Sequence, residues 1–335
     1  MTAPRLLAVL LNYRTAEMTA RAADSAMHAL GRLPAEMVIV DNDSGDGSFE
    51  ALSAHVTERG WDNVRVIESG WNGGYGAGNN VGMRAGLSDG SAPDFYYLLN
   101  SDAFPAPDAI EVLYDHLVQN PKVGFVGSHI HGEDGDGHVT AFRFPSVLSE
   151  FEGAARTGPI TRLLAHHRMP LDQLPIRPER VDWLAGASLM MRREVLEEIG
   201  LFDETFFLYF EETDLCLRAA RAGWPTWYIP QSRVAHIGSV STGMKTWDRV
   251  PGFWLDSRSH YFTKNHGWLT AVLATKAHVL GGLIWRLRAA IQSRPPADPK
   301  HFLRDLIAHD FRALWPWKVK ARQIRPLGDK THDPA

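Results

Sequence analysis

The first third of the chain alternates short aliphatic runs with longer amphipathic stretches, and this alternation limits the fold more than any other feature. Four aliphatic runs have the length of a strand: about residues 6–11, 37–41, 64–68 and 95–100. Three stretches between them have apolar side chains at helical spacing: residues 17–30, 48–59 and 79–87. This order predicts parallel strands joined by crossover helices. We therefore expect a Rossmann-like α/β unit.

Composition narrows the class of protein further. The chain has 335 residues, of which 44% are hydrophobic and 22% charged, enough for one large or two ordinary domains with a buried core. A net charge of −4 gives no general attraction to polyanions, so we expect no nucleic-acid partner. The single cysteine, Cys216, excludes an internal disulfide framework and a cysteine-based zinc cluster. Residues 1–15 do not resemble an export signal, so we expect a cytoplasmic protein.

The alternation of strand-like and helix-like segments weakens in the middle of the chain and returns after residue 180. Residues 127–178 lack sustained periodicity, and we interpret them as a variable insertion. Beyond it, the sequence predicts two strands and three helices: strands at residues 181–191 and 226–229, and helices at residues 193–199, 211–222 and 253–266. We expect one domain over residues 1–240, followed by a flexible loop and a helical region over residues 241–335.

Residues 268–290 form a long apolar stretch that contains three cations, Lys276, Arg286 and Arg288. These charges argue against a membrane-spanning helix. Mixed tryptophan, leucine and arginine side chains are typical of an amphipathic helix on a bilayer surface. A helix packed on the rest of the chain, or on a second copy in a homo-oligomer, explains the same pattern equally well.

Polar side chains follow three of the predicted strands, at the point where each strand ends. They are Asn12, Asp41, Asn42, Ser44, Asn100, Ser101 and Asp102. Ligands of open parallel sheets bind beyond the carboxyl ends of the strands, so these side chains are expected to meet in one crevice. Each group alone is explained by a turn. Their recurrence at the same end of successive strands favours the crevice.

A glycine-rich segment, residues 72–80, follows the third predicted strand and opens a helix. Its candidate binding residues are Asn72, Gly73, Gly74, Tyr75, Gly78 and Asn79. Such a loop brings backbone close to a ligand and directs helix amides at an anion. The glycine spacing is not that of a dinucleotide fingerprint, and no P-loop lysine follows. The segment predicts a sugar or phosphate contact, with tight helix–strand packing as the alternative.

Five residues, Asp102 among them, have side chains suited to metal binding or proton transfer. Asp102 lies just past a strand, where one carboxylate suits a hard cation that bridges phosphates. His236, at another strand end, has an imidazole that can complete a metal site or bond a phosphate. Glu211, Glu212 and Asp214 open a helix, a position that the helix macrodipole also favours. The aromatic residues 206–210 would desolvate these acids, which raises the pKa of a carboxyl and makes it a usable base.

Taken together, these motifs resemble the inverting family-two glycosyltransferases with the GT-A fold, in particular the bacterial rhamnosyltransferase-like branch. The likeness covers residues 6–241 and continues more weakly to residue 267. It rests on these segments: residues 11–13, 40–48, 72–80, 99–102, 183–187 and 200–204, with the acidic helix start and His236. Their order and approximate spacing match the family.

The resemblance implies an α/β GT-A enzyme with a C-terminal helical extension. Such an enzyme moves a sugar from a dTDP- or UDP-linked donor to a hydroxyl of a glycan or lipid-linked acceptor, with inversion. It would use Mg2+ or Mn2+ in cell-surface polysaccharide biosynthesis, at the cytoplasmic face of the inner membrane. The insertion at residues 127–178 and the helical region would then face the acceptor, the membrane surface or a second copy.

The resemblance also implies a role for each matched residue. Asn12 and Asp41 look like nucleotide contacts, and Asp102 and His236 look like metal ligands. Glu212 is similar to the family's general base. The expected acceptor side consists of Trp183, Ala185, Gly186 and Ala187. Two departures matter: Asn100 replaces the first acid of the DxD motif, and Glu212 stands where aspartate is commoner, which leaves Glu211 and Asp214 as rival bases.

Two other functions remain open at this point. A nucleotidyltransferase that makes a nucleotide sugar has a related fold, but it needs a glycine-rich, basic loop after the first strand. Here that position reads Asn12-Tyr13-Arg14-Thr15, with one cation. A non-catalytic glycan- or membrane-binding scaffold is suggested by the missing DxD acid. Pyrophosphate release from a nucleoside triphosphate would favour the first alternative, and absence of nucleotide binding would favour the second.

Overall fold

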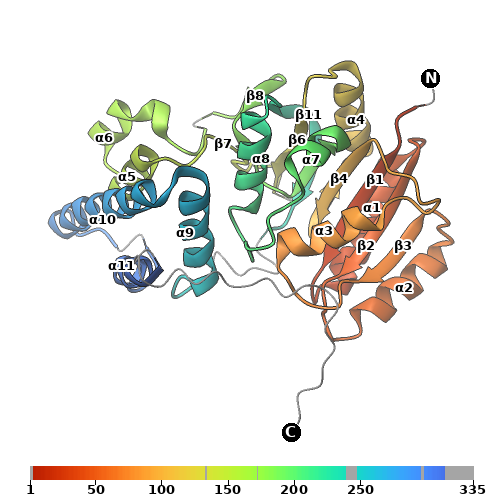
Figure 1. Ribbon diagram of the computed structural model, residues 1–335, viewed down its shortest axis with the longest axis horizontal. Helices are drawn as coiled ribbons and strands as arrows, with labels where there is room; N and C mark the ends of the chain where they lie inside the picture. Colours follow the sequence, from red (N-terminus) through yellow and green to blue (C-terminus); the bar gives the residue numbers. More distant parts are fainter. Residues whose placement is uncertain (1–2, 133, 172, 239–246, 296–297, 314–335) are drawn as a thin grey trace, which may run out of the picture.

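In our computed structural model, a mixed β-sheet of nine strands forms the core of one part of the molecule, and a group of helices lies beside it (Figure 1). The structure describes residues 3–132, 134–171, 173–238, 247–295 and 298–313. The strand order is β3-β2-β1-β4-β10-β6-β11-β5, and β8 pairs with β11. The bounds are β1 (Leu6–Asn12), β2 (Ala35–Asp41), β3 (Val64–Glu68), β4 (Phe95–Asn100), β5 (Ala103–Pro105), β6 (Phe125–His131), β8 (Glu179–Val181), β10 (Ser188–Arg192) and β11 (Thr226–His236). β7 (Ala141–Phe142) and β9 (Trp183–Leu184) pair separately.

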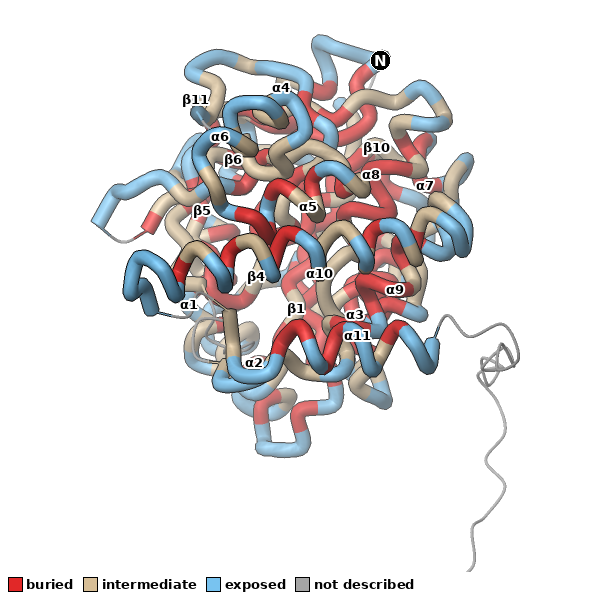
Figure 2. Tube along the Cα trace, turned by 90° about the vertical axis from the view of Figure 1, so that its left-hand side faces the viewer, coloured by how far each residue is buried: buried red, intermediate tan, exposed pale blue. Residues whose placement is uncertain are grey.

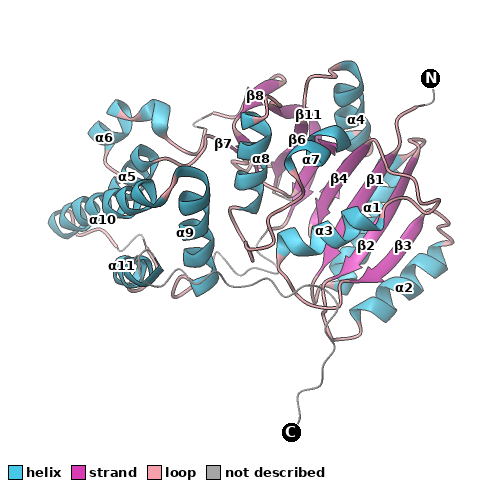
Figure 3. Ribbon diagram, in the orientation of Figure 1, coloured by secondary structure: helices cyan, strands magenta, loops and turns pink. Residues whose placement is uncertain are grey.

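Helices cover both faces of this sheet (Figure 3). One face holds α1 (Ala16–Leu30), α2 (Ser48–Arg59) and α4 (Ala109–Gln119); the other holds α3 (Tyr75–Ala85), α7 (Arg193–Ile199) and α8 (Glu211–Arg221). The sequence of strand β1 is apolar throughout because the strand is buried on both of its faces. Leu6, Ala8 and Leu10 join the first core, whereas Leu7 and Val9 join the second. A strand buried on both faces reads as a continuous hydrophobic run.

The observed elements confirm most of the predicted ones in the first third of the chain. All four predicted strands are present, and the third helix starts at Tyr75, inside the glycine-rich segment. The single strand predicted at residues 181–191 is wrong, because that stretch is divided among β8, β9 and β10. Pairing with three different partners, β11, β7 and β4, breaks the run. The turn between β9 and β10 contains Gly186, which lies at the site described below.

A second group of helices lies beside the sheet. It consists of α5 (Val147–Ala155), α6 (Gly158–Leu163), a 3-10 turn (Ala165–His167), α9 (Gly252–His266), α10 (Trp268–Ile291) and α11 (Phe302–Ala313). The segment predicted as a variable insertion, residues 127–178, therefore contributes α5 and α6 to this helical group. The predicted domain boundary at residue 240 lies outside the described residues.

A buried charge network holds the helical group together. The Arg258 side chain is 1% exposed; its guanidinium lies 2.9 Å from Glu150 of α5 and 3.2 Å from Asp310 of α11. Burial alone would raise the pKa of Glu150, but Arg258 and His278 outweigh it and lower the pKa to about 2. A buried guanidinium between two carboxylates fixes the positions of three helices because no water can replace it.

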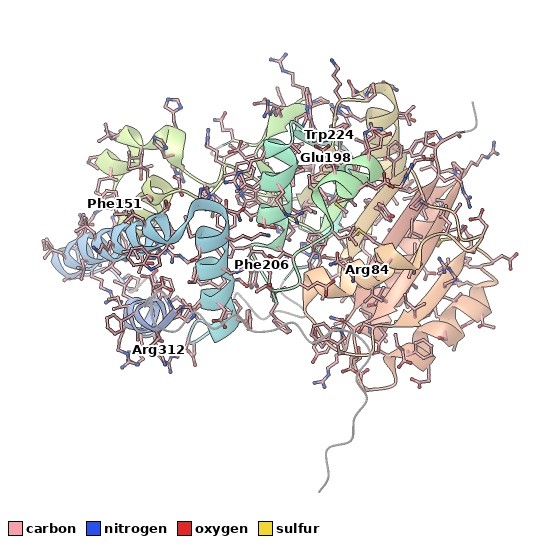
Figure 4. The ribbon with its side chains drawn as sticks, in the orientation of Figure 1. Arg84, Phe151, Glu198, Phe206, Trp224 and Arg312 are labelled. Atoms are coloured by element: carbon pink, nitrogen blue, oxygen red, sulfur yellow. The ribbon has the colours of Figure 1, made fainter. Side chains whose placement is uncertain are left out.

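Replacing Arg258 by methionine should strongly destabilise the protein. The change leaves Glu150 and Asp310 buried without their cation, and breaking a buried pair in this way costs about 3–5 kcal/mol. Urea unfolding measures the loss. Arg312→Met is the matched control, because Arg312 is exposed on α11 (Figure 4) and should change the unfolding free energy by less than about 0.5 kcal/mol. Equal effects of the two substitutions would show that the network contributes nothing to stability.

Candidate active site

The carboxyl ends of β1, β2 and β4 meet at one edge of the sheet, as the strand order requires. In the ladder, Asn12 is opposite Asp41, and Leu11 is opposite Asn100. A cavity of about 590 Å3 opens at this edge. Its lining comes from the strand ends, the start of α3, the start of α8 and the loop before β7.

Many of the predicted site residues line this cavity. They are Asn42, Asn72, Gly74, Tyr75, Asn100, Ser101, Asp102, Ala185, Glu211, Glu212 and His236. Other predicted residues lie behind the wall or away from it: Asn12, Asp41, Ser44, Gly73, Gly78, Asn79, Trp183, Gly186, Ala187 and Asp214. The structure therefore brings the metal candidates Asp102 and His236 and two of the three base candidates, Glu211 and Glu212, to one cavity.

Asn12, Asp41 and Ser44 form a closed hydrogen-bond network behind the cavity wall. Asn12 Nδ2 donates to Asp41 Oδ1 at 2.6 Å, and Ser44 Oγ donates to the same oxygen at 2.5 Å. The backbone amide of Arg14 donates to Ser44 Oγ at 2.9 Å. All three side chains are buried. The network fixes the turns after β1 and β2, and the nucleotide contacts expected of Asn12 and Asp41 stay a prediction.

Asp102 and His236 lie side by side because of strand pairing. β11 runs antiparallel to β5, and its register places His236 opposite Ala103. The imidazole Nε2 of His236 is 3.0 Å from Oδ1 of Asp102. Asn100 Nδ2 is 3.5 Å from the same nitrogen. The sequence motif and the histidine, which are 134 residues apart, thus form one group.

This group fits a divalent cation when phosphates supply the remaining ligands. Oδ1 of Asn100 is buried and has no hydrogen-bond partner within the described part of the chain. It adds an amide oxygen to one carboxylate and one imidazole. Hard cations bound to nucleotide phosphates need few protein ligands, because phosphate oxygens and water complete the octahedron. Among the described residues there is no group of three or more His, Cys, Asp or Glu that could hold a metal unaided.

Glu211 and Glu212 enter the cavity at the start of α8, after a sharp change in chain direction. Tyr209 and Phe210 both have a φ of 70°, a left-handed conformation that non-glycine residues rarely adopt. Oε1 of Glu212 accepts a hydrogen bond of 3.1 Å from the Gly186 amide. Oε2 of Glu211 is buried with no hydrogen-bond partner among the described residues. The two adjacent carboxyl groups therefore have different surroundings.

These surroundings separate the protonation states of the two glutamates. Burial raises the pKa of Glu212, whereas the amides of Glu212 and Gly186 oppose that rise. Burial first, and the charge of Glu212 second, raise the pKa of Glu211 well above its usual range. Each charge disfavours the other, and together with burial this favours the protonated form of Glu211. Glu212, with its amide donor, is the better site for the negative charge.

Asp214, the third candidate base, lies away from the cavity. Its Oδ2 is 2.8 Å from both the Arg218 guanidinium and the Lys264 ammonium. Its Oδ1 accepts a 2.8 Å hydrogen bond from Asn265. The carboxylate is thus fully engaged, and it ties α8 to α9. Phe206, labelled at this junction in Figure 4, packs against the same Lys264.

The glycines of residues 72–80 serve close packing. Gly74 has a φ of +88°, and a Cβ there would lie 1.8 Å from the carbonyl oxygen of Phe207. That oxygen accepts a 3.0 Å hydrogen bond from the Tyr75 amide. A Cβ on Gly78 would lie 2.5 Å from Leu11. These contacts hold the start of α3 against β1 and against the loop before α8.

Sequence reasoning missed part of the cavity wall. Three aromatic side chains, Phe207, Tyr209 and Phe253, and the loop residues 138–140 line it. The aromatic run 206–210 was a visible signal, since it precedes the acids. Residues 138–140 gave none, because no periodicity marks them. Trp183 stacks on Phe142 with ring centroids 4.2 Å apart and is not part of the cavity wall.

Comparison with known proteins shows the family to which the chain is similar. The family model described as "Glycosyl transferase family 2" matches residues 8–200. The N-acetylglucosaminyl-diphospho-decaprenol L-rhamnosyltransferase of Mycobacterium tuberculosis is 28% identical over 274 residues, which are 78% of this chain and 82% of that protein. The rhamnosyltransferase WbbL of Escherichia coli is 26% identical over 168 residues, 49% of this chain and 60% of that protein.

Two solved structures share the fold. A mannosyltransferase from Pyrobaculum calidifontis, in complex with GDP-Man and Mn2+, has a TM-score of 0.55 at 15% identity and covers 94% of this chain and 88% of its own. GalNAc-T7 with UDP, GalNAc and Mn2+ has a TM-score of 0.53 at 14% identity, covering 94% of this chain and 58% of its own. The predicted α/β GT-A fold with C-terminal helices is confirmed.

Proposed function

Because this chain belongs to glycosyl transferase family 2, we propose that it moves a sugar from a nucleotide-diphosphate sugar to an acceptor hydroxyl, with inversion at the anomeric carbon. The observation that carries this proposal is the convergence of two chemical groups on one cavity. The Asp102–His236 pair is suited to the diphosphate, and the Glu211–Glu212 pair is suited to removing a proton. Inversion needs these two groups on opposite sides of the reacting carbon.

The end of the cavity at which the nucleotide diphosphate would leave is formed by Asn100, Asp102 and His236; we call it the leaving-group side. A divalent cation held by these residues would neutralise the charge that builds on the departing diphosphate. Asp102 also accepts from, or pairs with, the His236 imidazole at 3.0 Å, which keeps both side chains in place before the donor binds. The Asn100 amide lies beside the same group, with its Nδ2 3.5 Å from His236 Nε2. We place the donor diphosphate at this end of the cavity.

The acceptor side is placed at Glu212. Its carboxylate would take the proton from the attacking hydroxyl, a role that typically contributes about a hundred- to ten-thousand-fold to the rate. The Gly186 amide at 3.1 Å holds the side chain and stabilises its charge. Tyr75 braces the same turn, since its hydroxyl donates to the Gly186 carbonyl oxygen at 2.7 Å. Glu211 would keep its proton and donate a hydrogen bond into the cavity.

This assignment predicts an acid limb in the pH profile. Glu212 must be deprotonated to act as a base, and burial raises its pKa above the ordinary value for glutamate, about 4.3. Activity should therefore fall as pH falls through the raised pKa, with a midpoint above about 4.3. Values of kcat/KM across the acid range measure it, with circular dichroism to separate unfolding from titration. A midpoint at or below the ordinary value would contradict the assignment.

For the donor we propose a dTDP- or UDP-linked hexose, with rhamnose as the first candidate. For the acceptor we propose a glycan or lipid-linked sugar of cell-surface polysaccharide biosynthesis. Rhamnose is supported by the names of the mycobacterial and Escherichia coli relatives, both rhamnosyltransferases, and a lipid-linked acceptor by the decaprenol acceptor of the mycobacterial one. A lipid-linked acceptor is presented at a membrane, so we place the enzyme at the cytoplasmic face, in peripheral contact through residues 268–290. The acceptor would approach past Ala185, on the side of Gly186 and Trp183.

Thermal stabilisation by a panel of nucleotide sugars, with and without Mn2+, tests the proposal. A ligand that binds only the folded protein raises its melting temperature. We expect a nucleotide sugar to stabilise the protein more with Mn2+ than without it, and transfer to follow with the same donor. Pyrophosphate release from a nucleoside triphosphate would instead establish a nucleotidyltransferase. Binding of no nucleotide at all would leave the non-catalytic scaffold.

A further inference from the structure

Helix α10 carries a straight apolar strip on its solvent side. Its exposed residues recur at alternating intervals of four and three: Leu269, Leu273, Lys276, Leu280, Leu283 and Leu287, with Ile291 one turn further. The exposed fraction reaches 67% at Leu287 and 76% at Ile291. Such spacing places all of these side chains on one face of a helix. Five leucines and an isoleucine in water are unusual for a face that packs against nothing in the described chain.

The opposite side of α10 is fixed to the protein. A Cβ on Gly281 would lie 2.5 Å from the Phe151 carbonyl oxygen of α5, and one on Gly282 would lie 2.8 Å from Leu303 of α11. Contacts this close need glycine, so the helix cannot rotate in place. The helix is long and apolar enough to cross a membrane by length and composition. Crossing would strip it from α5 and α11, whereas lying flat would not.

The segment that carries the strip has positive charge and no negative charge, although Asp256, which is 76% exposed, lies 3.0 Å from His309 of α11. Residues 268–295 contain four cations and no Asp or Glu. Lys276 and Arg286 are exposed on α10 itself. On α11 the acids Asp305 and Asp310 are buried in ion pairs. The solvent side of α10 and α11 therefore offers leucines and cations together.

The same side of the molecule exposes more apolar residues from neighbouring segments. They are Leu163 of α6, and Ile307 and Phe311 of α11. Figure 2 views this side, with α6, α5, α10 and α11 toward the viewer and exposed turns in pale blue. A pairing helix from a second copy would cover a single narrow strip and would need complementary charges beside it. A broad apolar surface around a helix whose only charged residues are cations matches a different partner.

We propose that this side of the molecule, which we call the α10 face, binds the surface of an anionic lipid bilayer. The α10 leucines would enter the boundary between headgroups and acyl chains, and Lys276 and Arg286 would meet lipid phosphates. The helix would lie in the plane of the membrane. The inference deepens the proposed function, on which it rests for the lipid-linked acceptor, by naming the partner surface and its charge.

Sedimentation with vesicles tests the apolar part of the α10 face. The full chain should sediment with phosphatidylglycerol–phosphatidylcholine vesicles and much less with phosphatidylcholine alone. Leu280→Gln with Leu287→Gln should weaken binding by at least about tenfold, because two leucines no longer leave water. Val118→Gln is the control, since Val118 is an exposed apolar residue of α4. Absence of vesicle binding, or equal binding by the double variant, would overturn the proposal.

Charge substitutions test the lipid specificity. Lys276→Gln with Arg286→Gln should weaken binding to the anionic vesicles by about fivefold for each cation removed. Arg32→Gln with Lys122→Gln, two exposed cations elsewhere, should leave it unchanged. Light scattering without lipid measures the mass of the protein in solution and so tests whether the strip instead binds a second copy of the chain. A dimer that Leu280→Gln and Leu287→Gln abolish would assign the strip to a second copy and overturn the membrane proposal.

Nucleotide binding separates this inference from the proposed function. Calorimetry with dTDP and UDP in the presence of Mn2+ should give the same affinity for all these variants, because the α10 face lies outside the cavity. Vesicle binding without nucleotide binding would refute the glycosyl-donor proposal alone. Nucleotide binding without vesicle binding would refute the membrane surface alone.

Discussion

Glu212→Gln should abolish sugar transfer while nucleotide binding remains intact. The amide keeps the size and shape of the carboxyl, so the side chain can still accept from the Gly186 amide. It cannot accept the proton of the attacking hydroxyl. We expect kcat to fall by about a hundred- to ten-thousand-fold, the usual contribution of a positioned base. Single-turnover transfer measures the loss, and calorimetry with dTDP or UDP and Mn2+ measures donor-side binding.

Glu211→Gln is the matched control for this substitution. Burial and the charge of Glu212 raise the pKa of Glu211, which is 1% exposed and whose Oε2 lacks a partner among the described residues, so its neutral form is favoured. A neutral glutamine in the same place should preserve much more activity than Glu212→Gln and keep the acid limb of the pH profile. If instead Glu211→Gln abolished transfer and Glu212→Gln did not, the base would be Glu211.

The sheet half of the fold could be predicted because its strands are buried on both faces. Strands such as Leu6–Asn12 and Ala35–Asp41 appear in the sequence as unbroken apolar runs between helices. Residues 181–191 misled the prediction for the same reason. That run is apolar because three short strands are all buried, and nothing in a local pattern tells one buried strand from three. The divisions come from pairing with distant partners.

The site was predictable where chemistry and position coincide in the sequence. Asp102 follows a strand and Glu212 opens a helix, and both positions project a side chain toward the same sheet edge. The partners of these residues were not predictable from local patterns. His236 meets Asp102 only through the β5–β11 register, and Gly186 meets Glu212 across a turn between two sheets. Asp214 is the opposite case. Its position in the sequence suits a base, but its carboxylate forms ion pairs with Lys264 and Arg218.

Asp102→Asn should remove the metal dependence of donor binding. The change keeps the side-chain volume and leaves an amide oxygen beside His236, but it deletes the charge that a divalent cation needs. Asn100 already replaces the other acid of the motif, so the site would then hold no carboxylate at all. Substitution of residues that only hydrogen-bond to metal ligands weakens metal binding by about 10–100-fold. Because Asp102 would itself be a ligand, we expect its substitution to lower nucleotide affinity in the presence of Mn2+ by at least about a hundredfold. Calorimetry with dTDP or UDP, with and without Mn2+, measures it.

The reverse substitution at the neighbouring position sharpens this test. Asn100→Asp restores the first acid of the motif at a strand end where the side-chain amide is 3.5 Å from His236 and its oxygen is buried without a partner among the described residues. If Asp102 and His236 hold the cation, the carboxylate added at residue 100 should tighten Mn2+-dependent nucleotide binding, because its negative charge would attract the neighbouring cation. Asp108→Asn removes an exposed acid in the loop after β5; it should change nothing and controls for the negative charge lost in Asp102→Asn. Unchanged Mn2+ dependence in both Asp102→Asn and Asn100→Asp would move the cation, and with it the leaving-group side, to another part of the cavity.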